Sequence, residues 1–304
     1  MRYFQNAREK GVNSFLAFVL SLLLIFGFYV LTSMPFALYA QFQGVIGEDM
    51  SQYQGPLSFA LLLFIFSGIL FGVIVATKSI HKRPVLSVFT GAPSFRWSHA
   101  FRSAGIWFAL MAVLEIVSFL YAPQDYTYQF QPGPFLVVLL ICLLVLPLQT
   151  TAEEVIMRGY LMQQIGLIAR TPWIPVLVTS LLFGFMHGAN PEIEQYGMAK
   201  SMTMYIAMGL FFGIVTVMDD GLEMPIGMHY INNLFAFIIV GYKGSVMEGL
   251  PSIFVKESEN LTWAAVVTNL IIMVVVLLIL KRYFHWPAFN QLFRKFKEPE
   301  SSIV

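Results

Sequence analysis

Long runs of apolar residues, separated by short polar segments, dominate the chain. A helix that crosses the hydrocarbon core of a bilayer needs about 20 mostly apolar residues. Eight runs approach or exceed this length; the first and fourth are longer than one crossing, and the fifth is short. The pattern predicts an all-α, polytopic membrane protein with about eight transmembrane helices, at residues 14–40, 57–77, 100–121, 135–168, 173–188, 201–218, 225–242 and 261–283.

The fourth run contains Pro147. Proline removes a backbone donor and clashes with the preceding turn, so we expect a kink at this point. No polar stretch is long enough to fold alone. Residues 1–304 are therefore expected to form a single integral membrane domain.

The composition agrees with a membrane protein. The chain is 58% hydrophobic and 12% charged, whereas a soluble domain is about 45–50% apolar and about 25% charged. The net charge of +1 offers no basic surface for a phosphate backbone, which excludes a nucleic-acid partner. The one cysteine, Cys142, lies in an apolar run and cannot form an internal disulfide.

An even number of crossings places both termini on the same side of the membrane. With the termini inside, the inner segments hold 15 of the 18 lysines and arginines, and the outer segments hold Lys200, Lys243 and Lys256. The positive-inside rule then favours cytoplasmic termini. We expect a multi-pass protein of a bacterial plasma membrane.

Ionisable side chains within apolar runs are costly and usually mark function. In the fourth run, Glu154 and Arg158 are four residues apart, so they share a helix face and can pair. Glu153 lies about 100° round the helix and is expected to have no partner from its own helix. This would free the Glu153 carboxylate for chemistry, unless both glutamates simply face water at a helix end.

His187 closes the fifth run. It lies about as far after the turn near Pro172 as Glu153 lies before it, so the two side chains have similar depths and can share a water molecule. On the helix after Pro225, His229 and Asn233 are four residues apart, and two such donors suit a developing oxyanion. Taken singly, His187 also fits a satisfied core residue, and His229 with Asn233 fits a polar pair that joins helices.

Together these groups indicate hydrolysis of an amide by an activated water. The depths of the two histidines in the membrane set one condition for this site. His229 is about 8 Å from its preceding loop by helix rise, whereas His187 is about 22 Å from its own turn. They meet only if the fourth and fifth helices extend beyond the membrane on the inner side, with the site in a cavity open to the cytoplasm.

These segments resemble the CAAX protease and bacteriocin-processing (CPBP, or Abi) family of intramembrane proteases, which includes the type II CAAX prenyl endopeptidase. The resemblance covers residues 135–242, expected to be a four-helix catalytic core, although Met157 stands where the family often has an aromatic residue. The family pattern is EExxxR, FxxxH and HxxxN, matched in order by Glu153-Glu154 with Arg158, Phe183 with His187, and His229 with Asn233.

The resemblance implies that Glu153 is the general base on a water, with His187 holding this water or helping to shuttle its proton. It implies that His229 and Asn233 stabilise the oxyanion, and that Glu154 and Arg158 order the helix. The family has also been described as metalloproteases, and Glu153, His187 and His229 are an alternative zinc-ligand set. We favour a reaction without a cofactor, and the chain has no HExxH pair.

The sequence thus predicts an endopeptidase that cleaves a membrane protein or membrane-associated peptide near the inner leaflet of the lipid bilayer. One alternative is a non-catalytic membrane scaffold, such as a bacteriocin self-immunity or regulatory protein. Another is a transporter that uses buried carboxylates and histidines as a proton relay. The chain lacks the repeated halves with broken helices that transporters often have.

Overall fold

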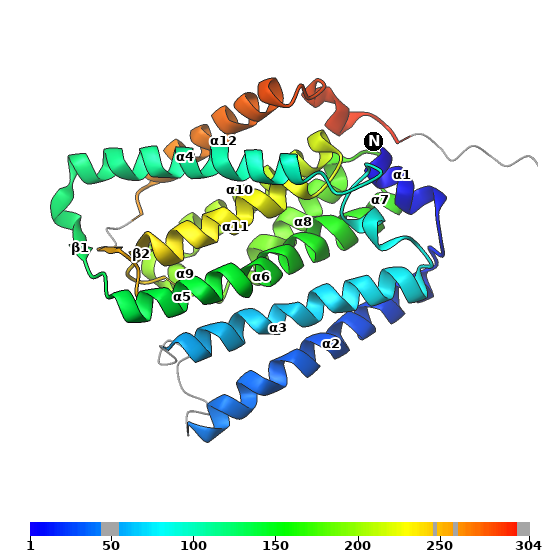
Figure 1. Cartoon of the computed structure of the whole chain (residues 1–304). Helices are drawn as coiled ribbons and strands as arrows, with labels where there is room; N and C mark the ends of the chain where they lie inside the picture. Colours follow the sequence, from blue (N-terminus) through cyan, green and yellow to red (C-terminus); the bar gives the residue numbers. More distant parts are fainter. Residues whose placement is uncertain (44–54, 246–247, 258–260, 297–304) are drawn as a thin grey trace, which may run out of the picture.

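The computed structural model describes residues 1–43, 55–245, 248–257 and 261–296, and it is mainly helical (Figure 1). The α-helices are α1 (Arg2–Glu9), α2 (Phe15–Phe42), α3 (Pro56–Val75), α4 (Trp97–Tyr121), α5 (Pro132–Leu144), α6 (Leu146–Glu154), α7 (Met162–Ile168), α8 (Trp173–Met186), α9 (Pro191–Tyr196), α10 (Met198–Asp219), α11 (Glu223–Ile238) and α12 (Trp263–Tyr283). Short π or 3₁₀ segments are η2 (Ala76–Ile80), η3 (Val85–Val88), η4 (Pro123–Asp125), η5 (Val155–Leu161) and η6 (Phe289–Phe293), and the strands are β1 (Tyr126–Tyr128), β2 (Val240–Tyr242) and β3 (Phe254–Lys256).

The all-α, polytopic membrane fold is confirmed. In the described part of the chain, six helical segments are long and apolar enough to cross a membrane: Phe15–Phe42, Pro56–Ile80, Trp97–Tyr121, Pro132–Ile168, Met198–Asp219 and Trp263–Tyr283. The other two expected spans are shorter helices, because α8 has 14 residues and α11 has 16. In both cases the apolar run is longer than the helix. The helix α8 ends in a turn that begins at His187, and the run that contains α11 continues as the strand Val240–Tyr242.

The segment Pro132–Ile168 bends where Pro147 predicts. The helix α5 ends at Leu144, and α6 starts afresh with Pro147 in its first turn. The π-helical η5 then follows α6 directly. Wider turns of this kind occur often at functional sites, and this one begins immediately after the two glutamates.

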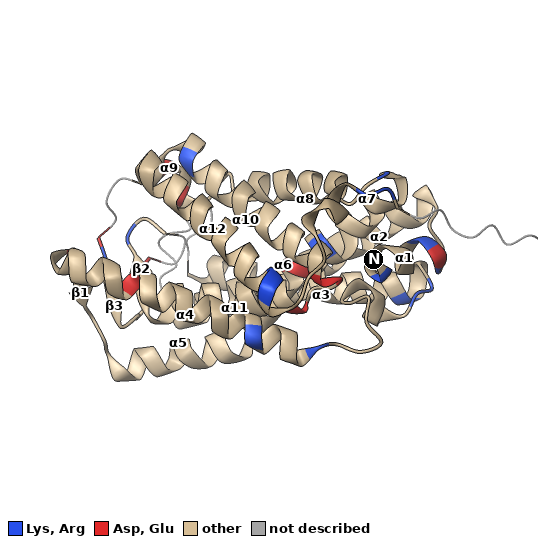
Figure 2. Cartoon of the chain, turned by 90° about the horizontal axis from the view of Figure 1, so that it is seen from above, with Lys and Arg blue, Asp and Glu red and all other residues tan. Residues whose placement is uncertain are grey.

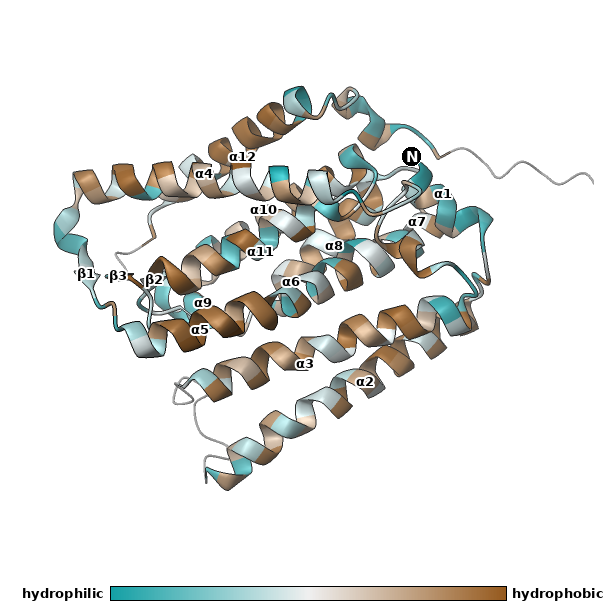
Figure 3. Ribbon diagram, viewed as in Figure 1, coloured by the Kyte–Doolittle hydropathy of each residue, from teal (hydrophilic) through white to brown (hydrophobic). Residues whose placement is uncertain are grey.

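The long helices lie side by side with the α2–α3 hairpin on one side of the bundle and α4 and α12 on the other (Figure 1). Between them lie α5 to α8, α10 and α11. Hydrophobic residues run along the outer helices, whereas hydrophilic residues gather at both ends of the bundle (Figure 3). Large apolar side chains such as Phe15, Leu120 and Leu144 are exposed, as expected for a surface that lipid covers.

Both described chain ends meet at one end of the bundle, which we name the α1 end. The Phe4 ring packs on Phe296 with centroids 4.9 Å apart. Arg8 donates to the carbonyls of Gly166 and Ala169, which satisfies the last turn of α7. Most lysines and arginines lie in this half of the molecule (Figure 2).

The opposite end, the strand end, carries a three-stranded sheet in the order β1-β3-β2. The strand β3 pairs antiparallel with β1 and parallel with β2, so Lys256 lies opposite both Tyr126 and Tyr242. The hydroxyls of these two tyrosines donate to the Glu115 carboxylate of α4. This carboxylate fastens the sheet to the helix bundle.

Small residues bring α8 and α10 into close contact. A Cβ atom on Gly209 would lie 2.8 Å from the Cα atom of Ser180, and one on Gly213 would lie 3.0 Å from the Val176 side chain. The spacing of Gly209 and Gly213 is the GxxxG pattern that lets membrane helices approach closely.

Gly209→Ala should therefore destabilise the bundle by about 1–3 kcal/mol, because its methyl group meets the backbone of the facing helix. Thermal unfolding in detergent measures the effect. Gly105→Ala on α4 is the matched control, since no heavy atom lies within 4 Å of its added Cβ position. Equal melting temperatures for the two variants would contradict the close-packing argument.

Candidate functional site

The residues singled out by the sequence come from four neighbouring elements. Glu153 and Glu154 are the last two residues of α6, and Arg158 lies in the π-helical η5. His187 follows the last residue of α8. His229 and Asn233 lie on α11, which packs against α6.

A buried chain of charged groups forms the floor of the site. Arg158 Nη1 donates to Glu154 Oε1 over 3.0 Å, and neither side chain is exposed. Arg158 Nη2 also donates to the Gly209 carbonyl over 3.3 Å. Glu154 Oε1 lies 2.8 Å from His229 Nδ1. Because a carboxylate paired with a guanidinium accepts hydrogen bonds, His229 carries a proton on Nδ1.

Aromatic rings enclose this chain of charges. The Arg158 guanidinium lies 4.6 Å from the Phe183 ring centroid and 5.7 Å from that of Phe212. Phe212 also stacks on the His229 imidazole at 5.5 Å. The phenylalanine of the second motif therefore packs against the arginine of the first, and cation–π attraction lowers the cost of burying the charge.

Glu153 has closer partners than the sequence predicts. Gln149, one turn earlier on α6, donates from Nε2 to Glu153 Oε1 over 2.6 Å. The expectation that Glu153 has no partner from its own helix is wrong, because a neutral amide at i−4 shares its helix face and donates to it. His229 Nε2 lies 3.5 Å from the second oxygen, Oε2. The Glu153 side chain is 14% exposed, unlike that of Glu154.

Gln149 connects the carboxylate to α11. Its Oε1 accepts from Asn233 Nδ2 over 3.5 Å, a long hydrogen bond. Asn233 Oδ1 accepts from Asn232 Nδ2, and Trp107 Nε1 on α4 donates to Asn232 Oδ1, both over 3.2 Å. The sequence analysis missed Gln149 and Trp107. A glutamine four residues before Glu153 was a readable signal, whereas no pattern along the chain pairs Trp107 with α11.

His187 lies beside this network on the other side of Phe183. Its Nδ1 lies 2.7 Å from the Phe183 carbonyl, so it donates there, and its ring stacks on Tyr205 at 4.6 Å. In the neutral imidazole, this leaves Nε2 as an acceptor. Among the described residues, no hydrogen bond joins His187 directly to Glu153.

His229 of α11 lies level with both glutamates of α6, since its imidazole reaches each of them. The helical run continues from Glu154 through η5 and α7 to Ile168. This extension lies against α1 and η3 at the α1 end, with Gly159 beside the Val88 carbonyl and Gly166 beside the Phe4 ring.

The alternative zinc set of Glu153, His187 and His229 does not fit this geometry. Within the described ranges, no group of three or more His, Cys, Asp or Glu side chains is arranged to hold a metal ion. We therefore derive no step through a metal.

Comparison with known proteins finds one family whose model matches the part of the chain that holds this site. Residues 132–235 match the family described as "Type II CAAX prenyl endopeptidase Rce1-like", and all the motif residues lie inside this range. The chain is also 28% identical over 267 residues to "Uncharacterized protein YyaK" of Bacillus subtilis (strain 168), an alignment that covers 85% of this chain and 89% of that protein. No solved structure matches the chain.

Arg158→Met should destabilise the protein by about 3–5 kcal/mol, because it leaves the Glu154 carboxylate buried without its cation. Adding Glu154→Gln removes the unpaired charge and should recover at least half of the loss. Thermal unfolding in detergent compares the two variants. If the double variant is no more stable than Arg158→Met, the buried ion pair is not what limits stability.

Proposed function

We propose that the chain is an intramembrane endopeptidase that uses Glu153 to activate water, and the match of residues 132–235 to the Rce1-like family of type II CAAX prenyl endopeptidases supports this. One observation carries this proposal: the exposed fraction of the side chains rises along the charged network from Arg158 to Glu153. Arg158 and Glu154 are fully buried, the His229 side chain is 7% exposed and that of Glu153 is 14% exposed. Water therefore meets the network at the Glu153 carboxylate.

Glu153 acts first as a general base. It takes a proton from water while the water oxygen bonds to the carbonyl carbon of the substrate, and the carbonyl π electrons move to its oxygen. The Gln149 amide holds Oε1, which leaves Oε2, 3.5 Å from His229 Nε2, to take the proton. Nε2 of His187, free of the Phe183 carbonyl, is the acceptor that holds or relays this water's protons.

The second step needs donors for the oxyanion. Among the described residues, Asn233 Nδ2 makes one hydrogen bond, the 3.5 Å contact to Gln149, so it can turn to the substrate at little cost. His229 donates from Nε2 when both of its ring nitrogens carry protons. Glu153 then transfers its proton to the leaving amine as the C–N bond breaks, which returns the carboxylate to its starting state.

Glu154 and Arg158 act through His229 rather than on substrate. They are fully buried, and their pairing fixes which imidazole nitrogen faces Glu153. The distribution of lysines and arginines favours a cytoplasmic position for the α1 end. The substrate is then a membrane-associated protein or peptide whose scissile bond lies toward the inner leaflet.

Glu153→Gln should lower cleavage by about 10²–10⁴-fold, the contribution of a general base, without unfolding the protein, because the amide can still bond to Gln149. The assay uses purified protein in liposomes with a library of membrane-anchored peptides, and mass spectrometry counts new amino termini. Glu194→Gln, on the exposed side of α9, is the control carboxylate and should cleave like the wild type.

Full biological activity of Glu153→Gln in cells, with no cleavage by the wild type in liposomes, would instead establish the non-catalytic scaffold. A chelator in the same assay should leave cleavage unchanged. If the chelator abolishes cleavage and added zinc restores it, the metal-free mechanism is wrong.

Gln149→Leu should lower kcat by about 10- to 100-fold and leave KM nearly unchanged, because Glu153 loses the bond that orients it while the substrate contacts persist. Gln164→Leu is the matched control: Gln164 is a buried glutamine of α7 whose amide nitrogen has no hydrogen-bond partner among the described residues. A change confined to KM would assign Gln149 to substrate binding instead.

A further inference from the structure

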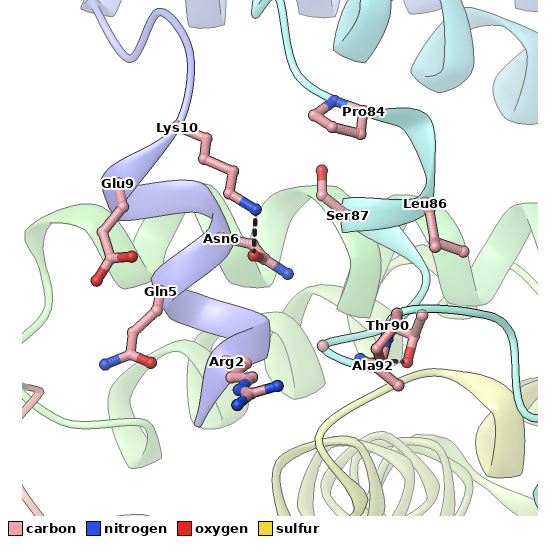
Figure 4. A pocket seen from close by; sticks show the side chains of 12 residues that line it. Arg2, Gln5, Asn6, Glu9, Lys10, Pro84, Leu86, Ser87, Thr90 and Ala92 are labelled. Atoms are coloured by element: carbon pink, nitrogen blue, oxygen red, sulfur yellow. Dashed lines mark hydrogen bonds between the residues drawn. The ribbon is translucent and has the colours of Figure 1, made fainter.

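A polar cavity lies at the α1 end, between α1 and the segment that runs from Pro84 through η3 to Pro93 (Figure 4). Its volume is about 470 Å³, within the range of small-molecule sites. None of the residues that line it belongs to the network around Glu153.

The two walls of this cavity are fixed relative to each other. Gln163 of α7 donates from Nε2 to the carbonyls of Tyr3 on one wall and Ser87 on the other. The Tyr3 hydroxyl also donates to the Val88 carbonyl over 3.0 Å. Because buried hydrogen bonds hold both walls, the cavity exists before any ligand binds.

Both walls of the cavity carry side-chain hydrogen-bond donors that are not used in other contacts. Ser87 is 5% exposed, and its Oγ has no hydrogen-bond partner among the described residues. Figure 4 shows Ser87 on the η3 wall, with Asn6 and Lys10 on the α1 side facing it. Lys10 Nζ donates to Asn6 Oδ1 over 3.2 Å, which leaves the Asn6 amide N–H groups and two ammonium protons available.

Cationic side chains line the cavity, and at its edge the Asp220 carboxylate accepts from the backbone N–H groups of Arg2 and Tyr3. Arg2 and Lys10 both line it, whereas the one lining carboxylate, Glu9, extends from the side of α1 away from Ser87 (Figure 4). Next to the lining residue Pro84, the Arg83 guanidinium is buried and bonds to Gln163, and it forms no ion pair with any described carboxylate. A buried hydroxyl with ammonium, guanidinium and amide donors is the chemistry that binds phosphate oxygens.

We propose that this cavity binds a phosphate-bearing ligand, either a lipid headgroup or a soluble phosphate ester, with Ser87, Lys10 and Asn6 as its donors. The site is independent of the proposed peptidase activity. The serine hydroxyl would gain the partner it lacks, and the phosphate would neutralise the excess positive charge at this end.

Isothermal titration calorimetry of the full-length protein in maltoside detergent tests the proposal with four probes: inorganic phosphate, glycerol 3-phosphate, dihexanoyl-phosphatidylglycerol and the phosphate-free dihexanoylglycerol. Ser87→Ala and Lys10→Ala should each weaken binding of a phosphate probe about tenfold, the effect of losing one charge-assisted hydrogen bond. Ser87→Ala should keep the wild-type melting temperature, because its hydroxyl bonds to nothing in the described structure.

Arg282→Ala, an exposed cation of α12 outside the cavity, is the matched control and should bind like the wild type. Binding of phosphatidylglycerol alone would identify a lipid headgroup site, and binding of the soluble probes would identify a site for phosphate esters. The proposal is overturned if no phosphate probe binds, if dihexanoylglycerol binds equally well, or if the Ser87→Ala and Lys10→Ala variants bind like the wild type.

Discussion

A guanidinium buried in the middle of a helix bundle constrains everything around it. Arg158 is inaccessible to solvent, so each contact it makes must offset the cost of its burial. Glu154 supplies the counter-charge, the Gly209 carbonyl accepts a further bond, and the rings of Phe183 and Phe212 cover its faces. These groups come from α6, α8 and α10, so burial of one charge fixes how three helices meet.

The same constraint sets the chemistry of α11. Glu154 is shared between Arg158 and His229, and the shared oxygen determines that the imidazole turns Nδ1 inward and Nε2 toward Glu153. The two adjacent glutamates thus differ in environment although they are neighbours in the sequence. Glu154 is buried and paired with Arg158, whereas Glu153 is bonded to the neutral amide of Gln149 and lies on the exposed side of the network.

How well the sequence predicts this arrangement depends on how far apart along the chain the interacting residues lie. The helices and the pairing of Glu154 with Arg158 follow from local periodicity, because both depend on residues within a few turns. The lengths of α8 and α11 do not, since a turn ends the first helix and pairing of Val240–Tyr242 with a distant strand ends the second. The contact of Trp107 with Asn232 likewise joins helices far apart in the chain. The order of the three motifs predicted which segments come together. It did not predict that Gln149 bonds to both Glu153 and Asn233.

The charged network does not stop at the site. The Tyr3 hydroxyl donates to the backbone carbonyls of both Arg158 and Val88, so α1 is bonded to the π-helical turn that carries the arginine. The Arg158 carbonyl lies in this π-helical turn, and Tyr3 donates to it from outside the helix. The first residues of the chain are therefore structural parts of the same unit as Glu154 and Arg158. Any ligand that fills the cavity between α1 and η3 contacts the two walls that this tyrosine joins.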